Sequence, residues 1–293
     1  KASTSNGLPS DSIRAIELDA AGKAWIGTYM GGVAAFDGTS WQTYKTAEGL
    51  VNGNVWDIAI DIDQNKWIAT EGGVSRFDGT TFTNYTQANG MSYQVCYSIA
   101  VDSDEFIWMG TYGDGVNRLD TATGQWQYYR TSNSPLPNNR VWDIAVDLAG
   151  NIWFATEGGV AMMDAISGNW TVYTSQLPNL TVRKIAIAGS GDKWFATAGG
   201  IARLAGTSWT VYNESTGMPE DSCRAIDVDY NNNVWVGTAG GGLCRLSGSA
   251  WTQFTTANSP LLDNTIWAVN AESPYRIWLG TGSKGVYLHE RAP

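Results

Sequence analysis

Short runs of alternating apolar and polar residues, separated by Gly, Asn and Asp, extend along the whole of this chain. The first clear run is Ile13 to Leu18, and a second begins near Trp25 after a polar turn. Alternation with a period of two, bounded by turn residues, predicts β-strands. No apolar run approaches the roughly 18 residues that cross a membrane as a helix. The pattern therefore predicts an all-β chain without a membrane span.

One short phrase, Trp-x-Gly/Ala-Thr, recurs seven times. Its tryptophans are Trp25, Trp67, Trp108, Trp153, Trp194, Trp235 and Trp278. They are separated by 42, 41, 45, 41, 41 and 43 residues. A period of about 40 to 45 residues is typical of propeller blades with four strands each. Seven copies predict a seven-bladed β-propeller that occupies residues 1–293 as a single domain.

Each repeat is expected to contain four antiparallel strands. The first covers residues 13–18, and its equivalents cover 55–60, 96–101, 141–146, 182–187, 223–228 and 266–271. The tryptophan phrase forms the second strand, a Gly-rich turn leads to the third, and the fourth carries an aromatic pair such as Trp41 and Tyr44. Each large aromatic side chain buries about 150 to 250 Å², which suits packing between twisted sheets. Most of the 15 tryptophans are therefore expected in the core.

An acidic residue stands six positions before six of the seven repeated tryptophans. These acids are Asp19, Asp61, Asp102, Asp147, Asp229 and Glu272, and Ala188 takes the place in the fifth repeat. Asp stabilises tight turns through hydrogen bonds to its own backbone. We expect a structural role for these acids rather than metal ligation.

The last repeat lacks an outer strand within the chain. When the repeats are aligned, residues 286–289 fall on residues 33–36, and Ala2 falls on Tyr44. We therefore expect an incomplete seventh blade at the termini, and residues upstream of Lys1 to supply the missing strand. The single histidine, His289, is expected to be packed or on an edge strand rather than catalytic.

Composition narrows the range of partners and cofactors. The chain has 18 Lys and Arg against 28 Asp and Glu, a formal net charge of −10. This argues against a nucleic-acid partner, because such binding begins from a basic surface. The three cysteines lie in apolar strand patterns and are expected as small buried side chains. With one histidine and no Cys-x-x-Cys pair, phosphate loop or nucleophile elbow, no metal and no cofactor are expected.

The order of these phrases resembles the two-component regulator propeller repeats, which run from Leu-Pro through Val-x-x-Ile, Asp, Gly and Ile-Trp-Ile-Gly-Thr to Gly-Gly-Leu, Phe and an aromatic outer strand. The first repeat matches best, from Leu8-Pro9 through Asp19 and Trp25-Ile26-Gly27-Thr28 to Phe36-Asp37. The resemblance covers essentially the whole chain. It implies a propeller fold and a role like that of the periplasmic sensing regions of bacterial hybrid sensor kinases, many of which detect glycans.

Connectivity places the blade-linking loops and the Gly-rich turns on one face of the disc, and the Asp-Gly turns on the other. The start of each inner strand then lines the channel mouth on the first face. At their second position the inner strands carry three arginines and four aromatic residues: Arg14, Trp56, Tyr97, Trp142, Arg183, Arg224 and Trp267. The fourth position is aliphatic instead, from Ile16 to Val269. The second position is therefore the candidate ligand-binding ring, with Tyr29 and Tyr112 of the Gly-rich turns beside it.

Flat indole faces beside planar guanidinium groups suit a glycan or another small polar or anionic ligand. Apolar sugar faces stack on indole, and carboxylates accept hydrogen bonds from Arg. A structural alternative is that these side chains fill the mouth and pair with Asp57, Asp143 and Asp227. The binding interpretation predicts a non-catalytic ligand-binding or sensing propeller in the periplasm or outside the cell.

Two other functions stay open. Glu71 and Glu157 lie in Gly-rich turns, and with Asp57 and Asp143 they form two similar carboxylate pairs in the second and fourth repeats. Paired carboxylates act as acid and base in glycosidases, so a carbohydrate-active lyase or hydrolase is one alternative. Duplication of a blade explains the same pairs without catalysis. The other alternative is a scaffold that binds a protein partner.

Overall fold

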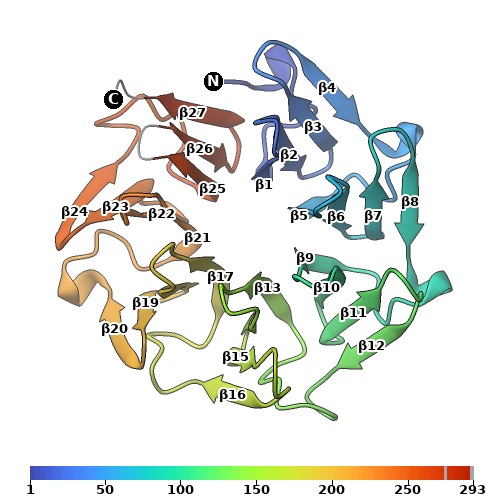
Figure 1. The fold of residues 1–293 in the computed structure, drawn as a ribbon. Coiled ribbons are helices and arrows are strands. Elements are labelled where there is room, and N and C mark those ends of the chain that lie inside the picture. The colour runs from blue at the N-terminus through green and yellow to red at the C-terminus, as the bar shows by residue number, and fades with distance from the viewer. Residues whose placement is uncertain (274–275, 291–293) are drawn as a thin grey trace.

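The computed structural model describes residues 1–273 and 276–290 and arranges their strands as seven sheets around a central axis (Figure 1). Six sheets have four antiparallel strands in chain order, and the last has three. The predicted seven-bladed propeller with an incomplete last blade is therefore confirmed. The N-terminus lies beside β27, at the seam between the last and first blades (Figure 1).

The strands follow the predicted boundaries closely. The innermost strands are β1 (Ile13–Leu18), β5 (Val55–Ile60), β9 (Cys96–Val101), β13 (Val141–Val146), β17 (Val182–Ile187), β21 (Cys223–Val228) and β25 (Ile266–Ser273). The second strands are β2 (Ala24–Thr28), β6 (Lys66–Thr70), β10 (Phe106–Thr111), β14 (Ile152–Thr156), β18 (Lys193–Thr197), β22 (Val234–Thr238) and β26 (Arg276–Thr281). Alternation of apolar and polar positions thus located the inner half of every blade.

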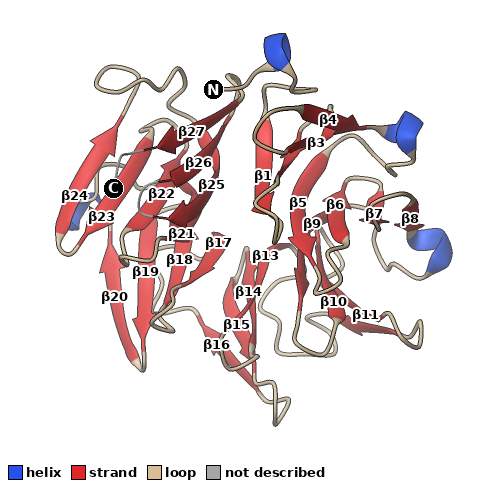
Figure 2. Ribbon diagram, turned by 45° about the horizontal axis from the view of Figure 1, so that its top comes forward, coloured by secondary structure: helices blue, strands red, loops and turns tan. Residues whose placement is uncertain are grey.

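The outer half of each blade contains the third and fourth strands. The third strands are β3 (Gly32–Phe36), β7 (Gly73–Phe77), β11 (Val116–Asp120), β15 (Gly159–Met163), β19 (Gly200–Ala205), β23 (Leu243–Ser247) and β27 (Val286–Glu290). The fourth strands are β4 (Trp41–Tyr44), β8 (Phe82–Tyr85), β12 (Trp126–Tyr129), β16 (Trp170–Tyr173), β20 (Ser208–Tyr212) and β24 (Ala250–Phe254). Single 3₁₀ turns lie outside the sheets (Figure 2), at η1 (Thr4–Asn6), η2 (Thr46–Glu48), η3 (Gln87–Asn89) and η4 (Glu214–Thr216). None of the described residues forms a helix long and apolar enough to cross a membrane.

The core lies between neighbouring blades. Trp25 of the first blade packs in one cluster with Val55 and Ile68 of the second. All seven tryptophans of the repeated phrase are at most 5% exposed. Burying such large side chains removes apolar surface from water at roughly 25 cal/mol per Å². These tryptophans therefore stabilise the fold by packing between blades.

The acids before the repeated tryptophans are structural, as expected, and each has a second function beyond its turn. Asp61 accepts a hydrogen bond of 2.9 Å from the indole Nε1 of Trp67, and it also accepts one from the backbone N of Asn65 at 2.8 Å. Five other blades repeat the acid–indole bond, at 2.7–3.2 Å. A buried indole N–H needs an acceptor, and the turn supplies one.

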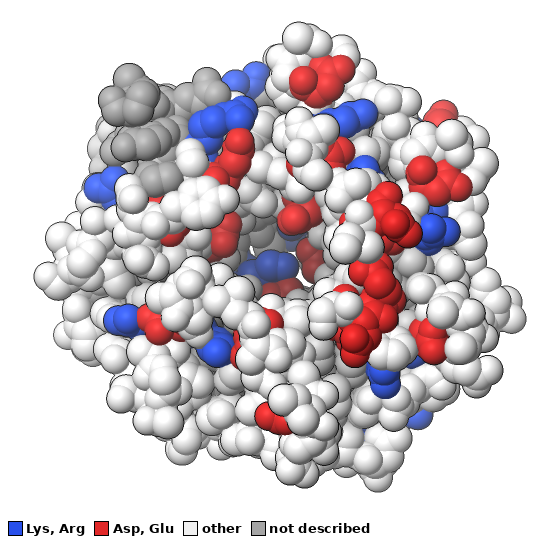
Figure 3. All heavy atoms as spheres, in the orientation of Figure 1, with Lys and Arg blue, Asp and Glu red and all other residues white. Residues whose placement is uncertain are grey.

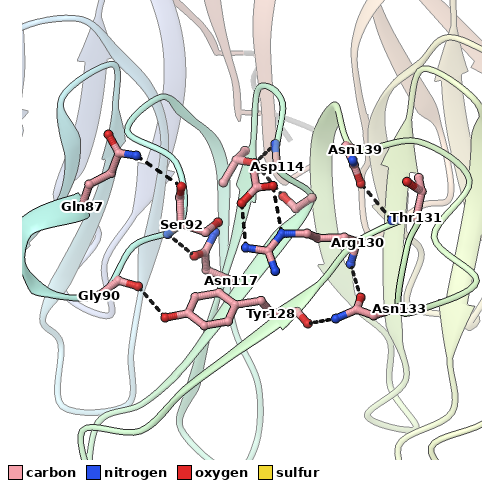
Figure 4. A network of polar contacts seen from close by, with 12 residues as sticks. Gln87, Gly90, Ser92, Asp114, Asn117, Tyr128, Arg130, Thr131, Asn133 and Asn139 are labelled. Atoms are coloured by element: carbon pink, nitrogen blue, oxygen red, sulfur yellow. Dashed lines mark hydrogen bonds and ion pairs between the residues drawn. The ribbon is translucent and has the colours of Figure 1, made fainter.

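The blade-linking loops and the Gly-rich turns share one face, as the connectivity predicts. The backbone N of Gly32 donates to the carbonyl of Gly53 at 2.9 Å, and that of Gly285 to the carbonyl of Asp11 at 2.8 Å. Figure 4 shows the corresponding region around the third blade. There Arg130 makes two bonds of 2.8 Å to Asp114, and this partner lowers the pKa of Asp114. These contacts fix the Gly-rich turn that carries Tyr112.

Candidate functional site

A β-bulge lies at the start of every inner strand. In β1, Ile13 is opposite Thr28 and Ala15 is opposite Gly27, so Arg14 is the additional residue. The same register shift occurs in all seven blades. A bulge interrupts the regular alternation and re-aims a side chain. As a result, the seven second-position residues together line one cavity of about 380 Å³ on the channel axis.

Aromatic side chains occupy one arc of this mouth, in the second, third and fourth blades. The ring of Tyr97 lies 4.6 Å from that of Trp56 and 4.8 Å from that of Trp142 between centroids. Tyr97 and Trp142 are nearly parallel, with an interplanar angle of 8°. Part of each aromatic face is therefore covered by its neighbour, and the remaining faces border the cavity.

Arginines occupy the opposite arc, in the fifth, sixth and first blades. The guanidinium carbon of Arg14 lies 3.9 Å from the Trp267 ring centroid, and that of Arg224 lies 4.5 Å from it. Arg183 completes the arc and donates to the carbonyl of Cys223 at 3.3 Å. All three arginines are half-buried. The mouth therefore has a cationic side and an aromatic side.

Several donors on this ring have no acceptor within the described part of the chain. They are Nε and Nη1 of Arg14, Nε of Arg183 and Arg224, and Nε1 of Trp142. Burial lowers the pKa of each of the three guanidinium groups, and the charge of Arg224 lowers those of Arg14 and Arg183 further. None of the three makes an ion pair with a carboxylate of the described residues. Unpaired buried donors cost free energy, so an anionic acceptor would stabilise this arrangement.

The Gly-rich turns surround the ring with tyrosines and two glutamates. Tyr29 lies beside Arg14, with 5.4 Å between the guanidinium carbon and the ring centroid. Tyr112 meets Tyr97 edge to face at 5.4 Å. Glu71 accepts hydrogen bonds from Asn54 and from Nε1 of Trp56 at 2.6 and 3.3 Å. Both predicted tyrosines thus lie at the rim of the mouth.

Glu157 forms an ion pair with Arg140, a residue of the linking loop that precedes the fourth blade. The guanidinium carbon of Arg140 lies 4.1 Å from the ring centroid of Tyr112. Sequence analysis did not identify Arg140, because the loops carry no strand periodicity. Glu71 and Glu157 are both held by hydrogen-bond donors in their own blades.

Asp57 and Asp143 lie deeper in the channel and do not pair with the arginines of the ring. Nζ of Lys184 lies 2.8 Å from Asp143 and 3.5 Å from Asp57. Asp57 also accepts from the backbone N of Ile99, and Asp143 from that of Ile185. Each aspartate therefore connects its own inner strand to the inner strand of the next blade. The proposed pairing of ring residues with Asp57, Asp143 and Asp227 is not what the structure contains.

Two more acids follow along the channel wall. Asp227 accepts from the backbone N of Ala271 at 2.7 Å, in the next blade. Burial, together with the charges of Asp57 and Asp227, raises the pKa of Glu17 to about 8, although the charge of Lys184 opposes this shift. Figure 3 shows side chains of both signs within the central hollow. Sequence analysis missed Glu17 and Lys184, although a charged residue within an otherwise apolar inner strand is a visible signal.

No group of three His, Cys, Asp or Glu side chains in the described residues is arranged to hold a metal ion. All three cysteines are buried and unpaired with one another, as predicted. His289 is exposed on β27, at the edge of the incomplete blade, and is not among the residues that line the channel cavity.

A family model described as two component regulator propeller matches residues 7–30 and 135–158, in the first and fourth blades. The predicted resemblance is therefore confirmed. A comparison with curated protein sequences gives no match.

Solved structures with the same fold include two extracellular domains from B. thetaiotaomicron. The extracellular domain assigned to the hybrid two component system BT3049 has a TM-score of 0.85 at 22% identity, over 100% of this chain and 42% of that one. The extracellular domain of BT4673 has a TM-score of 0.80 at 19% identity, over 98% and 40%. This chain thus spans about two fifths of the length of these domains. Virginiamycin B lyase from Staphylococcus aureus has a TM-score of 0.80 at 15% identity, over 96% of both chains.

Proposed function

Because this chain carries two-component regulator propeller repeats, we propose that it is a ligand-binding module of an extracytoplasmic sensor. Its ligand is a glycan or a related small polar molecule with an anionic group. The ligand binds at the channel mouth, on the face formed by the linking loops and the Gly-rich turns. The likeness of the fold to extracellular sensor domains supports the setting, and the residues of the mouth support the ligand class.

One observation carries the proposal: the three arginines of the mouth have buried donors for which the described residues offer no acceptor. Arg14, Arg183 and Arg224 offer planar, forked N–H groups that match a carboxylate or sulfate. The aromatic arc on the opposite side offers Trp56 and Trp142 to an apolar sugar face. An acidic sugar satisfies both sides at once, whereas a neutral apolar ligand leaves the guanidinium donors unpaired.

A carbohydrate-active enzyme has less support in the arrangement of its candidate residues. Asp57 and Asp143 share Lys184 and accept backbone hydrogen bonds across blades. Glu71 accepts a hydrogen bond from Trp56, and Glu157 forms an ion pair with Arg140. Acid–base catalysis needs groups free to exchange protons with a substrate. Release of new reducing ends or unsaturated sugars from a polysaccharide panel, abolished by Glu71→Gln or Glu157→Gln, would overturn the non-catalytic proposal.

The test is binding of a panel of neutral and uronic-acid oligosaccharides, measured by calorimetry at several salt concentrations. We expect the acidic oligosaccharides to bind and their affinity to fall as salt rises, because the Debye length shortens to about 8 Å at physiological ionic strength. The double variant Arg183→Gln/Arg224→Gln should lose this binding. Lys45→Gln, which removes one charge from an exposed side chain remote from the mouth, is the control. Equal affinity of both variants for an acidic oligosaccharide would contradict the proposal.

A further inference from the structure

The cavity of the channel mouth continues below the ring of second-position residues, on the side that carries the arginines. The third residues of β1, β21 and β25 there are Ala15, Ala225 and Ala268, and their small side chains line the cavity without filling it. The cavity then reaches Glu17 and Asp227, the fifth residues of β1 and β21. Successive residues of a strand are about 3.3 Å apart, so this level lies about 10 Å below the ring. A ligand anchored at the arginines therefore has room to extend to this depth.

The floor of this cavity has a charge opposite to that of its mouth. Five polar side chains line the cavity below the ring and form this floor: Glu17, Asp57, Lys184, Asp227 and Asn270. Three of them are carboxyl groups and one is an ammonium group, and Figure 3 shows acidic side chains on more than one side of the central hollow. Nζ of Lys184 lies 2.8 Å from Asp143, which does not line the cavity, and 3.5 Å from Asp57. The ammonium group of Lys184 is therefore already shared between two carboxylates.

The other two acids of the floor, Glu17 and Asp227, form no ion pair with the described residues. Asp227 accepts hydrogen bonds from the backbone N of Val228 and of Ala271, at 2.8 and 2.7 Å. The carboxyl group of Glu17 accepts none from the described part of the chain, and burial and the neighbouring acids raise its pKa, against the charge of Lys184. A second cation on the floor would therefore stabilise the ionised form of Glu17.

The geometry of the floor suits an ammonium group better than a bare metal ion. Among the residues that the structure describes, no three acids are placed to share one ion. Asp57 and Asp227 already direct oxygens at backbone N–H groups of the next blades. An ammonium group needs only separate acceptors for its three N–H donors. Glu17, Asp227 and the amide oxygen of Asn270, whose nitrogen donates to the carbonyl of Ile16 at 3.4 Å, offer such acceptors.

We propose that the ligand of the channel mouth carries, besides its anionic group, a protonated amine that reaches the floor and pairs with Glu17. The arginines of the mouth hold the anionic group, and Glu17 and Asp227 hold the amine about 10 Å below it. The ligand class is thus an acidic glycan fragment with a free amino group. This inference rests on the proposed function, because it assigns a second charged group to the same ligand.

The first experiment compares two disaccharides that differ only at the amine. One joins a uronic acid to glucosamine with a free amino group, and in the other this amine is N-acetylated. In calorimetry, the free amine should bind about ten-fold tighter or more, because hydrogen bonds between charged groups are stronger than neutral ones. Equal affinities would overturn this inference and leave the proposed function standing. Absence of binding by both would also overturn it, and the uronic-acid panel then decides the proposed function separately.

The second experiment removes the negative charge of the floor. Glu17→Gln should lower the affinity for the free-amine disaccharide to that for the N-acetylated one, and leave the latter unchanged. Asp63→Asn, which removes a negative charge from an exposed turn, is the control and should keep the full preference for the amine. A preference of the Glu17→Gln protein equal to that of the control would overturn the inference.

The third experiment needs no substitution. At slightly acidic pH, where the amine is protonated, Glu17 of the free protein also holds a proton. Pairing with the ammonium group favours the carboxylate, so binding should release up to about one proton from Glu17 to the buffer. Calorimetry in two buffers of different ionisation enthalpy measures this release. Equal release with the free-amine and the N-acetylated disaccharide would overturn the inference.

Discussion

The guanidinium of Arg14 lies against the indole of Trp267, 3.9 Å from its ring centroid, across the seam between the first and last blades. Arg224 approaches the same indole from the preceding blade. Such contacts are worth about 0.5 to 2 kcal/mol each and offset part of the repulsion between the two cations. Among the described residues no carboxylate forms an ion pair with these arginines, so the mouth keeps its positive charge concentrated.

Trp142 is predicted to contribute to ligand binding through its ring and through its Nε1, which has no acceptor in the part of the chain that the structure describes. Trp142→Ala should weaken binding of an acidic oligosaccharide by about 1 to 3 kcal/mol, as for a buried aromatic anchor. Trp142→Phe keeps a ring and removes the donor, so it should lose only part of this binding free energy. Calorimetry measures the affinities, and thermal unfolding checks that the fold is retained. Unchanged affinity with a lower thermal midpoint would assign the ring to packing alone.

Asp61 is predicted to stabilise its blade through the buried indole of Trp67. Asp61→Ala removes the acceptor of that indole and of the Asn65 backbone, which should cost about 1 to 3 kcal/mol in the free energy of unfolding. Asp63→Ala, in the exposed part of the same turn, is the control and should change stability by less than about 0.5 kcal/mol. Urea denaturation measures both. If Asp63→Ala lowered the free energy of unfolding as much as Asp61→Ala, the stability would depend on the turn itself and not on the hydrogen bond to the indole.

Lys184 is predicted to be coupled to the aspartates of the channel. Lys184→Met should destabilise the protein by about 1 to 3 kcal/mol, because it leaves Asp143 buried without its cation. This loss of stability is smaller than the loss expected for a fully buried ion pair, since 38% of the Lys184 side chain is exposed. Adding Asp143→Asn should recover part of the loss. A double-mutant cycle with no coupling energy would contradict the interpretation.

Glu17 is predicted to make stability fall with rising pH. Its pKa is about 8 in the folded protein against 4.5 for an ordinary Glu, so between these values the folded state holds a proton that the unfolded state has lost. Linkage then requires the free energy of unfolding to decrease as pH rises through this range. Glu17→Gln should remove this decrease. The free energy of unfolding of the variant should then equal that of the parent below this pH range and exceed it above the range. Denaturant titrations over the range test this, and parallel pH profiles would refute it.

The fold was predictable because each of the seven repeats carries the same sequence pattern, and each copy predicts one blade. Trp67, its Asp61 and the Gly-rich turn after Thr70 recur in sequence at a fixed period, and local alternation fixes which side of each strand is buried. The position of Arg14 and Trp56 at the channel mouth was also predictable, since connectivity alone decides which strand ends share a face. Even the three-stranded seventh sheet of the described residues followed from counting residues in the last repeat.

The partners of these side chains depended on the tertiary structure. Asp143 meets Lys184, Trp267 lies between Arg14 and Arg224, and Arg140 approaches Tyr112. These are contacts between neighbouring blades, made by residues that lie 28 or more positions apart in the chain. They depend on the bulges that turn the second position into the channel and on the angle between neighbouring sheets. A sequence period determines which residues are equivalent, whereas closure of the ring determines which of them touch.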